Sequence, residues 1–119
     1  MTGGSWGAWG TPLHPYAGYG WDIVTIGLDS DGGYQWHTFY GATASFGSDP
    51  GDVGRGIAWD GDGYLYVTGY STATWGTPLQ SHSGNRDIVV LKLAGDPGPG
   101  PDPFTFTDVT GVPLGTQQV

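Results

Sequence analysis

The sequence predicts an all-β protein of short antiparallel strands, and three observations lead to that prediction. Glycine and proline supply 24 and 9 of the 119 residues, which disfavours long helices. All 11 acidic residues are Asp, a turn former, and none is the helix former Glu. The third observation is an internal repeat, because Trp9–Leu13 recurs identically as Trp75–Leu79.

The repeat extends beyond this WGTPL loop segment. Thr2-Gly3 recurs as Thr68-Gly69 at the same offset of 66 positions. Asp22–Val24 recurs as Asp87–Val89 at an offset of 65, so one residue is lost in the second loop. A five-residue identity flanked by matching strand segments indicates a repeat protein.

Five strands are expected, each a short run of branched and aromatic residues bounded by turn residues. In chain order they are Asp22–Leu28, Tyr34–Tyr40, Gly56–Asp60, Tyr64–Ser71 and Asp87–Leu93. The polar turn 29–33 joins the first two as a hairpin, and a Gly-rich connector over 41–54 leads to the third.

The clearest element is the hairpin over 54–71. Its second strand alternates, with Tyr64, Tyr66 and Thr68 on one side and Leu65 and Val67 on the other. The connector Asp-Gly-Asp-Gly at 60–63 suits a tight turn, since glycine readily adopts the backbone angles required.

The alternation of side chains along the strands predicts two sets of core residues. Burial is predicted for Ile57, Leu65, Val67, Val89 and Leu91, and packing against neighbouring sheets for Tyr34, Trp36 and Trp59.

These strands resemble a known family. The GIAWD segment 56–60 and the YVTGYS segment 66–71, with the DIVVLKL segment 87–93, are similar to the bacterial β-propeller repeat (SBBP repeat) family. The DIVTIGL segment 22–28 is a weaker copy, with Gly27 where the family has Lys, and the aromatic segment 34–41 resembles its fourth strand. The resemblance covers about residues 2–93 and implies propeller blades, usually in a secreted or surface protein, with no particular activity.

A strand count against the family order predicts self-association. The first repeat is expected to keep only its last two strands and the second its first three, about one and a half repeats in all. Incomplete blades leave strand edges and an aromatic face open to water. We therefore expect a homo-oligomer in which chains complete one another by strand exchange, or in a ring or filament. The alternative donor of a missing strand is the segment Phe104–Val109.

Three regions are expected along the chain. Residues 1–94 form the propeller-repeat segment, and 95–103, rich in Pro and Gly, form an extended linker. Residues 104–119 look like the start of a further β segment, cut short. The chain is expected to begin mid-repeat, and Met1 is not followed by a secretory signal pattern.

The charge excludes two classes of partner. The net charge is −8, and the only basic residues are Arg55, Arg86 and Lys92. Nucleic acids and anionic membrane surfaces are therefore poor partners. No apolar run approaches the length needed for membrane insertion, and the chain has no cysteine.

Two turns are candidate metal sites. Asp29 with Asp31, and Asp60 with Asp62, place carboxylates two residues apart as calcium loops do. Neither turn has the later bidentate Glu of an EF-hand, so a plain hairpin turn is the favoured interpretation. The three histidines, at 14, 37 and 82, lack zinc-ligand spacing. No cofactor is expected, with calcium as the alternative.

Aromatic residues in the loops suggest a second function. Trp9, Tyr16, Trp21 and Trp75 are candidates for stacking against sugar rings. The competing interpretation is that each repeated Trp fills the gap between neighbouring blades.

Asp22 and Asp87 stand at equivalent strand entries, which predicts that they accept hydrogen bonds from loop amides.

These observations together predict a non-enzymatic, extracellular or cell-surface β-propeller-repeat module. It is expected to act as a scaffold or adhesion module that self-assembles. The alternative is a carbohydrate-binding, lectin-like propeller with glycans as partners.

Overall fold

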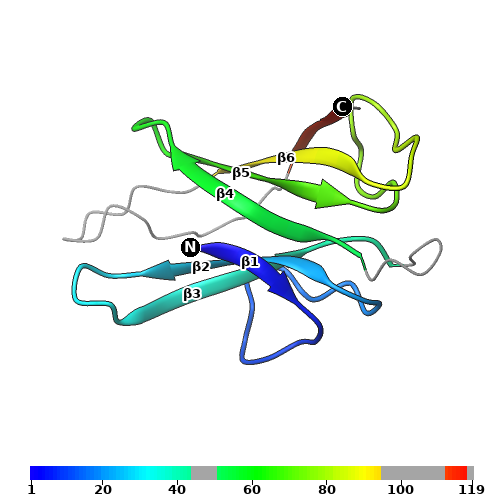
Figure 1. Cartoon of the computed structure of the whole chain (residues 1–119). Helices are drawn as coiled ribbons and strands as arrows, with labels where there is room; N and C mark the ends of the chain where they lie inside the picture. The colour runs from blue at the N-terminus through cyan, green and yellow to red at the C-terminus, as the bar shows by residue number, and fades with distance from the viewer. Residues whose placement is uncertain (44–50, 95–111, 118–119) are drawn as a thin grey trace.

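The computed structural model confirms an all-β protein of two antiparallel sheets (Figure 1). It describes residues 1–43 and 51–94 and the backbone of 112–117, and these contain no helix. The first sheet has the order β1 (Thr2–Ser5), β2 (Asp22–Leu28), β3 (Tyr34–Tyr40). The second has the order β4 (Val53–Trp59), β5 (Tyr64–Ser71), β6 (Asp87–Ala94), β7 (Val112–Gln117).

The expected count of five strands was too low, because two strands were missed. β1 pairs with β2 along its whole length, so the first repeat has three strands rather than two. β7 pairs with β6 and supplies a fourth strand to the second sheet. The segment Phe104–Val109, suggested for that place, lies outside the described residues. β4 also begins earlier than predicted, at Val53.

The sequence repeat is reproduced in hydrogen bonding. Ser5 stands opposite Asp22 in the first sheet, and Ser71 stands opposite Asp87 in the second. Each Ser Oγ donates to the carbonyl two residues on, at 2.9 Å in the first repeat and 2.8 Å in the second. The match between Thr2-Gly3 and Thr68-Gly69 is therefore a strand match, and it was the signal for β1.

Both predicted hairpin turns are present and are built alike. Asp29 Oδ1 accepts from the amides two and four residues later, at 3.1 and 2.6 Å. Asp60 Oδ1 does the same at 2.7 and 3.1 Å. Gly32 and Gly63, each three residues after the Asp, have φ of 82° and 97°, and Gly61 has a φ of 85°, a conformation that side chains with a Cβ rarely adopt. Aspartate and glycine at these places specify the turns together.

Replacing Gly61 by Val is expected to destabilise the protein by about 1–3 kcal/mol through backbone strain alone. A Cβ at Gly61 would meet nothing within 4 Å, so no steric clash adds to the effect. The control is Gly7→Val, which is equally open but has no positive φ. Urea unfolding of the three proteins measures the difference. Equal midpoints for the two variants would show that the turn is not strained.

The two sheets stack face to face over one hydrophobic core. Ile23 and Tyr40 point from the first sheet toward the second, and all six members of the core cluster are nearly or fully buried. The second sheet contributes four aliphatic residues, Val67, Val89, Leu91 and Leu93. The predicted burial of Val67, Val89 and Leu91 is confirmed.

The prediction of burial was wrong for Ile57, which is 38% exposed. Tyr34 and Trp59 are also exposed, whereas Leu65 and Trp36 are partly buried against the core. Ile57 shares a face with Val67, but it lies on the edge strand β4 and has a neighbouring strand on one side only. Alternation predicts which side of a sheet a residue faces, and it does not reveal how far the next sheet reaches.

Candidate functional site

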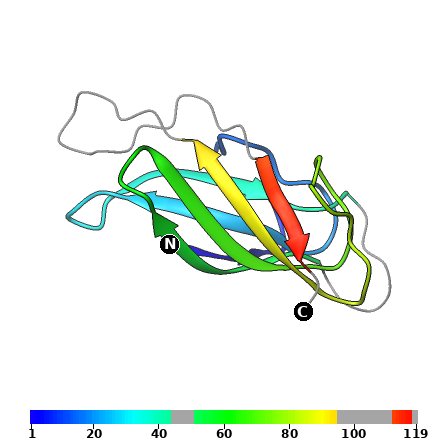
Figure 2. The same cartoon turned by 90° about the horizontal axis from the view of Figure 1, so that it is seen from above.

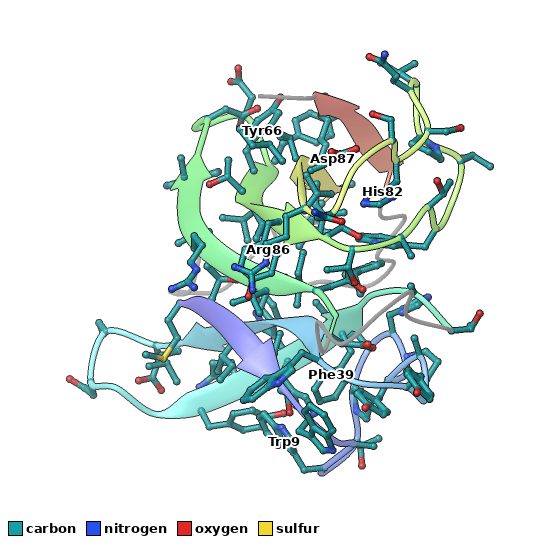
Figure 3. All side chains as sticks on the ribbon, turned by 45° about the vertical axis from the view of Figure 1, so that its right-hand side comes forward. Trp9, Phe39, Tyr66, His82, Arg86 and Asp87 are labelled. Atoms are coloured by element: carbon teal, nitrogen blue, oxygen red, sulfur yellow. The ribbon has the colours of Figure 1, made fainter. Side chains whose placement is uncertain are left out.

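The outer face of the first sheet, turned away from the second, is covered by the loop 6–21. Phe39 and His37 lie on this face and are fully buried. Trp9 stacks on the His37 ring at 3.8 Å between centroids and meets Phe39 edge-on at 5.8 Å. Figure 3 shows Trp9 beneath the first sheet, near Phe39. The loop therefore acts as a cap over this face.

The same loop also occupies the free edge of β3. The Leu13 amide donates to the His37 carbonyl at 2.9 Å, and the Phe39 amide donates to the His14 carbonyl at 3.2 Å. The His14 Nδ1–H donates to the Phe39 carbonyl at 2.7 Å, with the His14 ring stacked on Tyr40. These bonds satisfy backbone groups that an edge strand would otherwise offer to another chain.

His37 is held by both ring nitrogens. Its Nε2 lies 2.7 Å from the Trp9 carbonyl and so donates, which leaves Nδ1 to accept from the Tyr34 hydroxyl. A buried imidazole with both nitrogens engaged is a structural group. The hydrogen bonds of His37 position Trp9 within the cap.

Trp75, the repeat partner of Trp9, lies at the junction between the sheets. Its Nε1–H lies 2.9 Å from Ser71 Oγ and 3.2 Å from Asp52 Oδ1. Its ring is stacked against that of Tyr40 in the first sheet, with 6.5 Å between centroids and 22° between the ring planes. The identical WGTPL segments therefore have different roles. Trp75 lies between the two sheets, whereas Trp9 covers the outer face of the first sheet.

The four residues suggested for sugar binding occupy three separate places. Trp9 and Tyr16 both contact Phe39 in the cap. Trp21 meets Trp6 edge-on at 5.7 Å, and Trp75 is at the junction. Trp9 remains 42% exposed, while the other three are partly buried.

Two fully buried carboxylates, Asp22 and Asp52, also lie at the junction. Asp52 accepts from the Ala42 amide at 2.7 Å and from Trp75 Nε1–H, so it ties the end of the first sheet to the loop of the second. Burial raises the pKa of Asp52, and hydrogen bonds, that with Ser71 foremost, counteract the increase. Asp52 carries no repeat signal and was not among the residues predicted from the sequence.

Burial raises the pKa of Asp22 to about 6. The Ala17 amide, which donates to Oδ2 at 2.6 Å, lowers this pKa, Asp52 raises it and His14 lowers it. Among the described residues Oδ1 has no hydrogen-bond partner. A Cβ placed on Gly41 would overlap both carboxylates, so Asp22 and Asp52 flank the same glycine.

The prediction for the paired strand-entry aspartates is confirmed. Asp22 Oδ2 accepts from Ala17, and Asp87 Oδ2 accepts from the Ser83 amide at 2.7 Å. Each carboxylate anchors the end of its long loop to the strand that follows. Since Asp22 and Asp87 are almost completely buried, these hydrogen bonds are shielded from water.

The structure places Asp29 and Asp31 on one hairpin turn and Asp60 and Asp62 on the other. The Oδ1 atoms of Asp29 and Asp60 accept backbone amides, as described above. Within residues 1–43 and 51–94, no three His or Asp side chains gather as a metal site. The described part of the chain also has no helix long and apolar enough to cross a membrane.

The outer face of the second sheet forms a further candidate surface, here called the tyrosine face. Its members on β5 and β6 are Tyr64, Tyr66, Thr68, Tyr70, Ile88, Val90 and Lys92. Figure 2, seen from above, looks onto this side of the second sheet, and Figure 3 shows Tyr66 there. No described element packs over it.

All three basic side chains of the protein lie against tyrosines of this face. Lys92 Nζ is 3.7 Å from the Tyr64 ring centroid, and the Arg86 and Arg55 guanidinium carbons are 4.6 and 5.6 Å from that of Tyr70. These are cation–π distances. Tyrosines at alternate positions of β5 were the sequence signal for this surface.

Comparison with known families supports the resemblance to propeller repeats over part of the chain. Residues 35–74 match the model of the SBBP family, the beta-propeller repeat. The segment runs from β3 across the junction to β5 and the start of the following loop, and the match confirms the resemblance over that part of the chain. Comparisons with curated proteins and with solved structures give no match.

Proposed function

We propose that this chain is a non-enzymatic scaffold or adhesion module, extracellular or at the cell surface, that works by self-assembly of propeller-type blades. The family match and the blade-like sheets support the propeller part of the proposal. The complete burial of the strongest candidate acids, Asp22 and Asp52, favours a structural role for them over a catalytic one.

The observation that carries the proposal is the contrast between the two outer sheet faces. The first is covered by the cap of loop 6–21, with Phe39 fully buried. On the second, Ile88 is 40% and Tyr64 is 37% exposed. Propeller-type repeats bury such faces by stacking against neighbours. A sheet face with exposed aromatic and aliphatic side chains is suited to association.

Light scattering on the purified chain tests the proposal. We expect a mass above that of the monomer at about 100 μM, falling on dilution, as for a modest interface. A monomer at every concentration, with a cooperative melt, would exclude self-assembly as the mode of action.

Carbohydrate binding is proposed as a second function of the cap, because exposed aromatic side chains gather there. Trp6, Trp9 and Tyr19 in the loop are 61%, 42% and 56% exposed, and Tyr34 beside Trp9 is 53% exposed. Flat exposed rings suit stacking against sugars. A glycan array should then give binding that Trp6→Ala weakens. Trp75→Ala would be a poor test, because Trp75 links the two sheets.

A further inference from the structure

We propose that the tyrosine face is the self-association interface and that its partner is the same face of a second copy, related by a two-fold axis. The inference rests on the self-assembly proposed above and specifies its surface and symmetry. The expected product is a closed dimer, in place of the ring or filament considered from the sequence.

The internal repeat indicates that this face is suited to packing against another sheet. Ile88 corresponds to Ile23 and Val90 to Thr25 in the first sheet. Ile23 and Thr25 are fully buried on the side facing the second sheet. Ile88, at the equivalent place, is 40% exposed and Val90 is partly buried. The tyrosine face therefore continues an interface that the molecule already forms once internally.

The cap determines the symmetry of the association. In the second sheet, the face with Val89 and Leu91 packs on the first sheet, and the equivalent face of the first sheet is covered by Trp9 and Tyr16. Among the described residues, each copy thus has one blade face to offer. A contact made through a single self-complementary patch is isologous and closes as a dimer.

The tyrosine face has larger side chains than the equivalent face of the first sheet. The proposed contact between two copies therefore differs from the contact between the two sheets of one chain. Gly4 and Gly27 in the first sheet correspond to Tyr70 and Lys92. A Cβ on Gly4 would lie 2.9 Å from the Trp21 ring and 3.2 Å from Val53, so the second sheet approaches there because glycine leaves room. The bulky side chain of Tyr70 prevents so close an approach. Two tyrosine faces are therefore expected to meet through their side chains, and not by repeating the packing between the two sheets of one chain.

Charge also distinguishes this face from the rest of the molecule. The protein has a net charge of −8, yet β5 has no acidic residue and β6 has only the buried Asp87 at its start. All the Lys and Arg lie here, each beside a tyrosine ring. Two acidic molecules that approach through these surfaces keep their carboxylates apart, although the two-fold axis brings the Lys and Arg side chains of the two copies toward one another. We expect added salt, which screens the remaining repulsion, to strengthen the dimer.

The test introduces one charge within the proposed contact, at the position opposite Tyr70. Ile88→Lys and the control Leu79→Lys each replace an exposed aliphatic residue, and Leu79 is 83% exposed in the second loop. Both variants should fold like the parent. Sedimentation equilibrium from about 1 to 100 μM should show a dimer for the parent and for Leu79→Lys. Ile88→Lys should weaken association at least about tenfold.

A cross-link checks the face directly, because the chain has no native cysteine. Thr68→Cys lies on the exposed middle of β5. In a dimer of facing tyrosine surfaces, a short bis-maleimide should join two copies of Thr68→Cys and leave Leu79→Cys uncoupled. The reaction is run on the intact chain under the conditions in which the parent associates.

The outcomes separate this inference from the proposed function. Association that Ile88→Lys leaves unchanged, or that yields species larger than a dimer, overturns the two-fold tyrosine interface while self-assembly stands. A parent that is monomeric throughout overturns both. Loss of association in Ile88→Lys alone, together with cross-linking through Thr68→Cys, supports the assignment.

Discussion

Leu91→Ala is expected to destabilise the protein by about 2–5 kcal/mol. Leu91 is fully buried at the centre of the core, opposite Val67 on β5. The loss combines the transfer free energy of the deleted methyl groups with the cost of the cavity they leave, because close-packed neighbours relax only partly. Urea unfolding followed by tryptophan fluorescence measures the change.

The matched control is Ile57→Ala. Ile57 lies on the same face of the second sheet but is 38% exposed, so its truncation removes less buried area and leaves no closed cavity. We expect it to cost about 1 kcal/mol or less. Similar losses for both variants would show that the core does not lie between the two sheets as described.

The second large effect concerns pH. The pKa of Asp22 is raised from 3.8 to about 6 in the folded protein. The folded state therefore keeps a proton that the unfolded state has released between about pH 4 and pH 6, so stability falls as pH rises through this window. The full difference is about 3 kcal/mol, of which about 1 kcal/mol falls between pH 5 and pH 7.

Unfolding free energies of the parent and Asp22→Asn at pH 5 and pH 7 test this expectation. The parent should be more stable at pH 5, and Asp22→Asn should have a flatter profile because its side chain no longer titrates. Asp31→Asn, on an exposed turn, removes one negative charge in the same way and serves as the control for net charge. If Asp31→Asn flattens the profile as much as Asp22→Asn does, general charge repulsion is the cause.

Local rules were sufficient for much of the fold. Period-2 alternation predicted that Val67 is buried and Tyr64 outward, and Asp-Gly turns predicted both hairpins. The repeated DIV segments predicted the roles of Asp22 and Asp87. β1 was missed because its four residues include two glycines, which have low strand propensity. Only its equivalence to residues 68–71 could have identified it.

Fewer features of the candidate site could be predicted from such local rules. Trp9 and Trp75 stand in identical pentapeptides, yet one covers a free face and the other fills a junction. The difference depends on what lies against each sheet, and no local pattern contains that information. Asp52 was missed for the same reason, since its hydrogen bonds go to Ala42 and Trp75, 10 and 23 positions away.

The sequence by itself determined the all-β class, the repeat, both hairpins and the aliphatic side of β5 and β6. These depend on backbone propensity, turn geometry and the alternation of side chains along a strand, all of which act over a few residues. Tertiary structure alone decided that Ile57 is exposed, that Asp22 and Asp52 share a junction and that the tyrosine face is open. These features depend on contacts between segments far apart in the chain, where burial and charge act through proximity in space.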